Sequence, residues 1–148
     1  MLDRLSAYPA IGWDFDGTLI DHPHSERIHR FIRGQPQIKH VILTFRTHGF
    51  ERSIFTEMRD LYPDAPARSC FARVTNIEDK AWEQFRKAEL LRLNGMRGPP
   101  TEWERYYIEW KGCMCHRLGL PVLVDDRRTQ VMPGCQKYNI HYIHPDEL

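Results

Sequence analysis

Apolar stretches and turn-forming residues alternate along the chain, and the apolar positions follow two periodicities. Short stretches rich in apolar and β-branched residues predict strands at residues 10–15, 38–43, 71–77, 121–124 and 140–143. Between them, apolar residues recur three and four positions apart, which predicts helices over 25–34, 51–61, 79–93 and 101–118. Strands that alternate with helices indicate an α/β fold with a parallel central sheet covered on both faces.

Boundary residues support these helices. Ser25 is expected to be an N-cap and Gly34 to end the same helix, while Thr101 caps the longest helix and Gly119 ends it. A glycine- and proline-rich loop over 94–100 ends the helix before it. The predicted buried faces consist of Ile54, Phe55, Met58 and Leu61; Trp82, Phe85, Ala88 and Leu91 or Arg92; and Trp103, Tyr106 or Tyr107, Trp110, Met114 and Leu118.

Length and charge narrow the class of protein. The 148 residues predict one domain, 1–148, in which residues 79–100 form either a minimal cap over the site or a helical insertion beside the sheet. The net charge of +1 gives no bulk preference for nucleic acid or membrane. No apolar run reaches the ~18 residues of a membrane span, and residues 1–10 do not resemble a secretory signal. We therefore expect a cytoplasmic protein with reduced cysteines.

Acidic and hydroxyl side chains follow three of the predicted strands. Asp14 and Asp16 end the first strand, Thr44 ends the second, and Asp125 and Asp126 end the fourth. The carboxyl ends of parallel strands meet at one edge, where such sheets bind ligands. Two carboxylates 4 Å apart repel by about 4 kcal/mol at an effective dielectric constant of 20. A cation is needed to offset this repulsion, and the sequence offers two candidates, a bound Mg²⁺ or Lys111.

The spacing of the first acidic pair suits phosphoryl transfer. Gly17 allows a sharp turn, so that one carboxylate faces the substrate while the other swings out as an acid. Asp14 can then attack phosphorus and Asp16 can act as general acid and base. Thr44 can donate a hydrogen bond to the phosphoryl group, and Lys111 can neutralise its charge. Each residue also has a simpler alternative role. Asp14 and Asp16 can belong to an Asp-Gly turn, Thr44 can be an ordinary strand-end hydroxyl, and Lys111 can be a solvated lysine on a helix.

Four segments together resemble a known family. Asp14-Phe15-Asp16-Gly17-Thr18-Leu19 resembles the first motif of the haloacid dehalogenase (HAD) superfamily of phosphohydrolases. Val41-Ile42-Leu43-Thr44 resembles the second motif, Lys111 the third, and Val122-Leu123-Val124-Asp125-Asp126 the fourth, so that the four segments follow the family's order. Lys80, Lys87 and Lys137 are alternatives for the third motif; Lys111 is preferred because its helical run ends just before the acidic strand.

The resemblance implies a three-layer, Rossmann-like HAD fold without a large cap. It also implies a Mg²⁺-dependent phosphomonoester hydrolase that forms an aspartyl-phosphate on Asp14, with Asp16 as general acid and base. Mg²⁺ would be held by the Asp14 carboxylate, the Asp16 carbonyl and Asp125, with Asp126 binding directly or through water. We expect the phosphate to be bound by Gly17, Thr44, Arg46 and Lys111.

Several alternatives stay open at this point. The expected substrate is a phosphorylated small molecule or a nucleotide; the end of a nucleic acid is less favoured, and a non-catalytic phosphate-binding protein is the alternative of another class. His22 and His24 either line the substrate entrance or form a solvated loop. The Cys113–His116 segment is typical of buried thiols on a helix rather than of a zinc site, whose ligand pairs are spaced differently.

Overall fold

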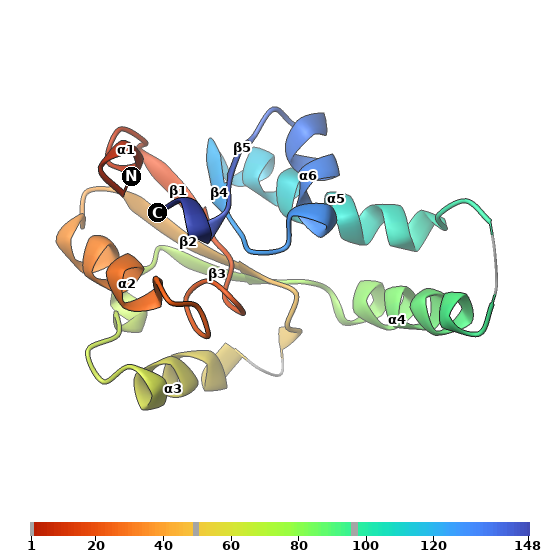
Figure 1. Cartoon of the computed structure of the whole chain (residues 1–148), viewed down its shortest axis with the longest axis horizontal. Coiled ribbons are helices and arrows are strands. Elements are labelled where there is room, and N and C mark those ends of the chain that lie inside the picture. Colours follow the sequence, from red (N-terminus) through yellow and green to blue (C-terminus); the bar gives the residue numbers. More distant parts are fainter. Residues whose placement is uncertain (1, 49–50, 96–97) are drawn as a thin grey trace.

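A five-stranded parallel sheet forms the centre of the protein (Figure 1). The computed structural model describes residues 2–48, 51–95 and 98–148, with the side chains of 51–53 left aside. The strands lie in the order β3-β2-β1-β4-β5 and are all parallel to their neighbours. Their bounds are β1 (Ala10–Trp13), β2 (Lys39–Thr44), β3 (Arg73–Asn76), β4 (Val122–Val124) and β5 (His141–Ile143).

Helices cover both faces of the sheet, which gives three layers and confirms the predicted α/β architecture. On one face, α2 (Ser25–Gly34) and α3 (Glu51–Leu61) pack their apolar residues against Ile11 and Trp13 of β1. On the other face, α5 (Glu102–Leu118) and α6 (Arg128–Lys137) pack against Val41 and Leu123. Short helical turns complete the fold: α1 (Leu2–Leu5), η2 (Arg68–Cys70) and η3 (Pro145–Glu147).

The strand order fixes where a ligand can bind. The chain runs outward from β1 through β2 to β3 and then returns to form β4 on the other side of β1. The connections after β1 and β4 therefore leave the sheet in opposite directions. In open parallel sheets a crevice forms at such a switch point, beyond the carboxyl ends of the strands. Asp14 and Asp125 come directly after these two strands.

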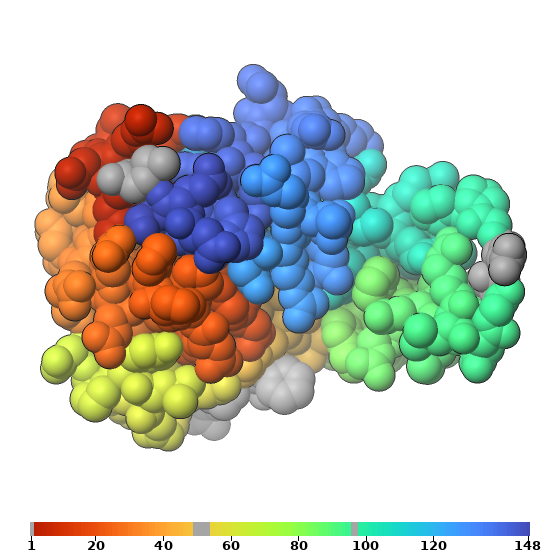
Figure 2. All heavy atoms as spheres, viewed as in Figure 1, coloured from red at the N-terminus to blue at the C-terminus, as the bar shows by residue number. Residues whose placement is uncertain are grey.

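A helical arm, made of α4 (Asp79–Leu93) and the first half of α5, extends beyond the sheet (Figures 1 and 2). Its interior contains Ala81 and Tyr107, with Phe85 and Trp103 packed against them. Thr101 and Glu104 form the predicted capping arrangement at the start of α5. Of the predicted loop over 94–100, residues 96 and 97 lie outside the described part of the chain.

Some details of the sequence prediction were wrong. The helix α2 begins at Ser25, so the N-cap is His24; the Ser25 hydroxyl instead donates to the carbonyl of Thr18 at 2.8 Å. Leu61, Trp82 and Leu91 were expected on buried faces, but 51%, 36% and 51% of their surfaces are exposed. On α4, Ala88 is buried as predicted, Phe85 packs against Tyr107, and Arg92, the predicted alternative to Leu91, is half-buried; Ala81 rather than Trp82 is buried at the start of the helix.

The helix α6 was not predicted because Pro133 and Gly134, residues that disfavour a helix interior, lie within it, although Val131, Gly134 and Cys135 share its buried face. Gly112 of α5 and Gly134 of α6 let the two backbones approach closely. A Cβ atom on Gly112 would lie 2.2 Å from the carbonyl carbon of Gly134. Part of the buried face of α6 is therefore a glycine and adds no apolar side chain to the sequence pattern. Among the residues described, no helix is both long enough and apolar enough to cross a membrane.

Candidate functional site

A buried ion-pair triad lies at the switch point between β1 and β4. The Nζ atom of Lys111 is 2.5 Å from Oδ1 of Asp14 and 2.6 Å from Oδ2 of Asp125. At most 5% of the surface of each of these residues is exposed. The Asp14 amide donates to the carbonyl of Val124 at 2.9 Å, which ties the end of β1 to β4. The structure thus brings together three of the predicted site residues from distant parts of the sequence.

Aromatic rings hold the lysine of this triad in place. Its ammonium lies 4.5 Å from the centre of the Phe45 ring, a cation–π arrangement. Phe45 stacks on Tyr107 with ring centres 4.0 Å apart, and Tyr107 stacks on Phe85 at 3.8 Å. This three-ring stack runs from the triad into the helical arm, so the arm helps to fix the position of Lys111.

Burial and charge act together on the triad. Burial raises the pKa of Asp14 well above the usual range of an aspartate, and nearby Asp125 adds to this although Lys111 opposes it. For Lys111, burial alone would lower the pKa, but Asp125 and Asp14 outweigh it and raise the pKa above that of an ordinary lysine. Lys111 is therefore a permanent cation here.

A divalent cation fits the acidic side chains of the site. Carboxylate oxygens of Asp14, Asp125 and Asp126 lie within 4.8 Å of one another. When all three carboxylates are ionised, one ammonium leaves two negative charges, which the two positive charges of one Mg²⁺ would balance. Oδ1 of Asp126 is also buried and has no hydrogen-bond partner among the residues that the structure describes, and such a group is unfavourable unless it is satisfied. Carboxylate oxygens are the donors that Mg²⁺ prefers.

Gly17 makes room for this carboxylate. Its φ angle of +79° lies in the left-handed region, and a Cβ atom there would lie 2.2 Å from Oδ2 of Asp126. No other residue type fits this position without strain. Gly17 therefore contributes to the site through the space it leaves beside Asp126.

Asp16 is paired with Arg46 outside the triad. The guanidinium donates from Nε to Oδ2 of Asp16 at 3.0 Å and from Nη2 to Oδ1 at 2.7 Å. It also donates from Nη1 to Oε2 of Glu57 at 2.6 Å. Glu57 was not singled out in the sequence, because a glutamate on a helix surface carries no signal of its own. Arg46, which was expected to bind phosphate, lines the cavity over the triad and also contacts the predicted general acid and base.

Thr44 and Asn76 shape the loop that carries Arg46. The buried hydroxyl of Thr44 accepts a hydrogen bond from the Arg46 amide at 3.1 Å. Asn76, at the end of β3, donates to the carbonyl of Arg46 at 3.1 Å. Asn76 was missed in the sequence, although it is a polar residue at the carboxyl end of a strand, as Thr44 is.

A cavity of about 500 Å³ opens over the triad. Its floor is formed by Asp14, Asp16 and Lys111, and its walls by Phe45, Arg46, Thr47, Trp82, Tyr107 and Arg127. His22 and His24 are not among these lining residues. They contact the C-terminal segment instead: Nε2 of His22 is 2.7 Å from Oδ1 of Asp146, and Nδ1 of His24 is 2.9 Å from the carbonyl of Pro145.

No family model matches this chain, and no curated protein matches it. A solved structure that does match is that of an uncharacterized protein from Corynebacterium glutamicum ATCC 13032 Kitasato. The match has 17% sequence identity and a TM-score of 0.45, and it covers 93% of this chain and 84% of the other. The function of the chain is therefore inferred from its own residues.

Proposed function

We propose that the protein is a Mg²⁺-dependent phosphomonoester hydrolase of the HAD type, which forms an aspartyl-phosphate on Asp14. The observation that carries this proposal is the triad: the Asp14 carboxylate lies on the floor of an open cavity, hydrogen-bonded to the buried cation Lys111. The acidic pair that follows β4 lies beside it. A buried carboxylate fixed by an ammonium is suited to attack phosphorus rather than to cap a turn.

Three carboxylates of this chain would hold the metal: Asp14, Asp125 and Asp126. When bound, Mg²⁺ would neutralise the charge of the phosphoryl group and orient it toward Asp14. Lys111 would contribute a second, permanent positive charge next to the nucleophile. Attack of one anion on another requires such positive charge around the reacting atoms.

In the first half-reaction, an oxygen of Asp14 attacks phosphorus and the bond from phosphorus to the ester oxygen breaks. The departing oxygen takes a proton from Asp16, which leaves an alcohol and the Asp16 carboxylate. In the second half-reaction, Asp16 takes a proton from water while the water oxygen attacks phosphorus. The bond from phosphorus to Asp14 breaks, and inorganic phosphate and the free Asp14 carboxylate result.

The state of the cysteines supports a reducing location for this activity. Cys70, Cys113, Cys115 and Cys135 are all free thiols. Burial raises the pKa of Cys115, which keeps this thiol protonated and unreactive. We therefore propose that the enzyme works in the cytoplasm.

Phosphate release tests the proposal. The wild-type chain and Asp14→Asn are incubated with a panel of phosphomonoesters, with Mg²⁺ or with EDTA. We expect release that needs both Mg²⁺ and Asp14. Asp60→Asn, a change at an exposed position of α3, is the matched control and should keep full activity. Tight phosphate binding without turnover of any ester would instead favour a phosphate-binding protein.

A further inference from the structure

The cavity is larger and more aromatic than a phosphate group requires. Its charged floor would hold the phosphoryl group, but three of its wall residues are the aromatic side chains Phe45, Tyr107 and Trp82. Its volume of about 500 Å³ lies within the range of small-molecule sites, which is about 300–1,000 Å³. The walls therefore have room for the part of the substrate that carries the phosphate.

Of these three aromatic side chains, Trp82 has the largest exposed fraction. Tyr107 lies between Phe45 and Phe85, with nearly parallel planes at 14° and 9°, so both of its faces are covered. Phe45 is covered by Tyr107 on one side and contacted by the Lys111 ammonium. Trp82 lines the cavity and has 36% of its surface exposed, although the Arg86 guanidinium lies over one side of its ring.

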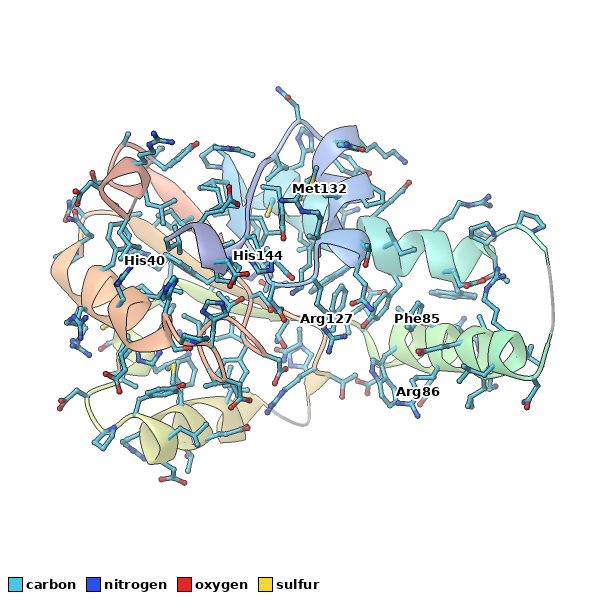
Figure 3. All side chains as sticks on the ribbon, viewed as in Figure 1. His40, Phe85, Arg86, Arg127, Met132 and His144 are labelled. Atoms are coloured by element: carbon cyan, nitrogen blue, oxygen red, sulfur yellow. The ribbon has the colours of Figure 1, made fainter. Side chains whose placement is uncertain are left out.

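The arm fixes Trp82 relative to the reacting groups. Trp82 lies in the first turn of α4, where its amide donates to the carbonyl of Glu78 at 3.1 Å. The neighbouring Ala81 is fully buried with Tyr107, a member of the stack that reaches the triad. The Arg86 guanidinium lies 5.2 Å from the Trp82 ring centre, and Figure 3 shows Arg86 and Arg127 near the junction of the arm and the sheet.

We propose that Trp82 forms a subsite for a planar aromatic ring of the substrate, while the phosphate of the same molecule lies at Asp14. The inference rests on the proposed hydrolase function and adds the substrate class to it. An exposed indole at the mouth of a charged cavity gains free energy when an apolar ring covers it. The ring can be the base of a nucleoside monophosphate or the phenyl group of an aryl phosphate, since both offer a flat face.

Matched pairs of ligands test this subsite. Adenosine 5′-monophosphate is compared with ribose 5-phosphate, which lacks only the base, and phenyl phosphate is compared with cyclohexyl phosphate, whose ring is not flat. Binding is measured by calorimetry on the Asp14→Asn chain with Mg²⁺, so that the result does not depend on turnover. The values of kcat/KM are measured on the wild-type background. Each measurement is repeated with Trp82→Ala, Trp82→Phe and the control Leu91→Ala, an exposed position on the same helix.

We expect Trp82→Ala to weaken binding of the aromatic member of a pair by about ten-fold or more, the usual effect of removing one stacking side chain. Binding of the non-aromatic member should change by less than about two-fold, within the range of a surface substitution. Trp82→Phe should restore most of the preference, and Leu91→Ala should leave it intact. If Trp82→Ala weakens aromatic binding only in the nucleotide pair, the ring that Trp82 binds is a nucleobase. If it does so only in the phenyl pair, the ring is an aryl group.

Equal affinity of the wild-type site for both members of each pair would overturn the subsite, and so would an aromatic preference that survives in Trp82→Ala. If turnover is observed in these cases, the hydrolase proposal stands. Absence of turnover with a Trp82-dependent preference in binding would have the opposite meaning: the subsite exists and the hydrolase proposal fails.

Discussion

Arg46 donates two hydrogen bonds to the Asp16 carboxylate, and the same guanidinium contacts Glu57. Such a forked pair with a permanent cation holds the Asp16 carboxylate in a defined orientation. The carboxylate is the form that takes a proton from water in the second half-reaction. In the first half-reaction Asp16 must carry a proton, so its contact with Arg46 has to loosen when the ester binds. Arg46 is therefore a positioning residue for Asp16.

We predict that Arg46→Gln impairs proton transfer more than phosphoryl transfer. For alkyl phosphates, whose departing oxygen needs a proton, the rate of Asp14 phosphorylation should fall by about 100-fold, the lower end of the usual contribution of general acid–base catalysis. For p-nitrophenyl phosphate, whose departing oxygen is stable as an anion, phosphorylation of Asp14 should fall much less. Rapid-quench kinetics with both esters measures this difference.

Glu57→Gln serves as the milder member of this series. It keeps the fork between Arg46 and Asp16 and removes only the charge of the third partner, so we expect a smaller loss with the same dependence on the leaving group. Equal losses for good and poor leaving groups in Arg46→Gln would show that Arg46 does not act through Asp16.

Lys111→Met should destabilise the fold because it leaves the carboxylates of the triad without a cation. Removal of one partner from a buried ion pair costs about 3–5 kcal/mol of unfolding free energy. Mg²⁺ should recover part of this loss, since it relieves the same repulsion. Urea unfolding with and without Mg²⁺ measures both effects.

The matched control is Lys137→Met. Lys137 pairs with Glu109 at 3.0 Å, but its side chain is 54% exposed. Exposed pairs contribute about 1 kcal/mol or less, so this variant should unfold almost as the wild type does. Equal destabilisation by the two substitutions would contradict a special role of the buried triad.

Gly17→Ala should weaken Mg²⁺ binding and lower stability. The left-handed backbone alone disfavours alanine by about 1–2 kcal/mol, and the new methyl group would collide with the Asp126 carboxylate. Gly34→Ala is the control, because a Cβ atom there meets nothing within 4 Å. That change should leave Mg²⁺ affinity unaltered and raise stability slightly. Calorimetry and thermal unfolding distinguish the two, and unchanged Mg²⁺ affinity in Gly17→Ala would exclude Asp126 from the metal site.

Two buried histidines should make the fold less stable in mild acid. Burial lowers the pKa of His29 and of His40, and Nδ1 of His40 accepts a hydrogen bond from the indole of Trp13 at 3.0 Å. The folded state thus holds both rings neutral, while the unfolded chain takes up protons near pH 6.5, at about the ordinary histidine pKa. The stabilisation is complete above that pH and is lost as the pH falls toward the folded-state pKa values.

Unfolding free energies measured from about pH 7.5 to about pH 5, a range that brackets the ordinary histidine pKa, give this dependence. His40→Gln keeps a hydrogen-bonding side chain but removes the titration, so it should flatten the pH dependence. His116→Gln, at an exposed position of α5, should not. A slope that His40→Gln leaves unchanged would assign the acid sensitivity to other groups.

The positions of Asp14, Thr44, Asp125 and Lys111 could be predicted because each depends on a simple rule. Acidic and hydroxyl residues after parallel strands meet at one edge of the sheet, and the helix of Lys111 leads directly into β4. Every strand end was predicted to within two residues; β1, β4 and residues 41–43 of β2 are continuously apolar, as buried parallel strands usually are.

The rest depends on contacts between segments far apart in the sequence. The pairing of Asp16 with Arg46 joins residues 30 positions apart, and nothing in either local sequence indicates it. The exposed surface of Trp82 follows from how α4 packs on α5, so the helical periodicity placed Phe85 and Ala88 correctly but Trp82 wrongly. The helix α6 was missed because Pro133 and Gly134 lie within it and because its contact with α5 is made partly by glycines.

The proposed mechanism depends on phosphorylation of the Asp14 carboxylate. The most direct measurement is to quench the chain in acid during turnover of a phosphomonoester with Mg²⁺, and to locate the added phosphoryl group by peptide mass spectrometry. We predict one phosphoryl group on Asp14, removable by hydroxylamine as an acyl phosphate and absent with EDTA. A phosphoryl group on another residue, or steady turnover with no phosphorylated chain in rapid-quench samples at any time, would contradict the account.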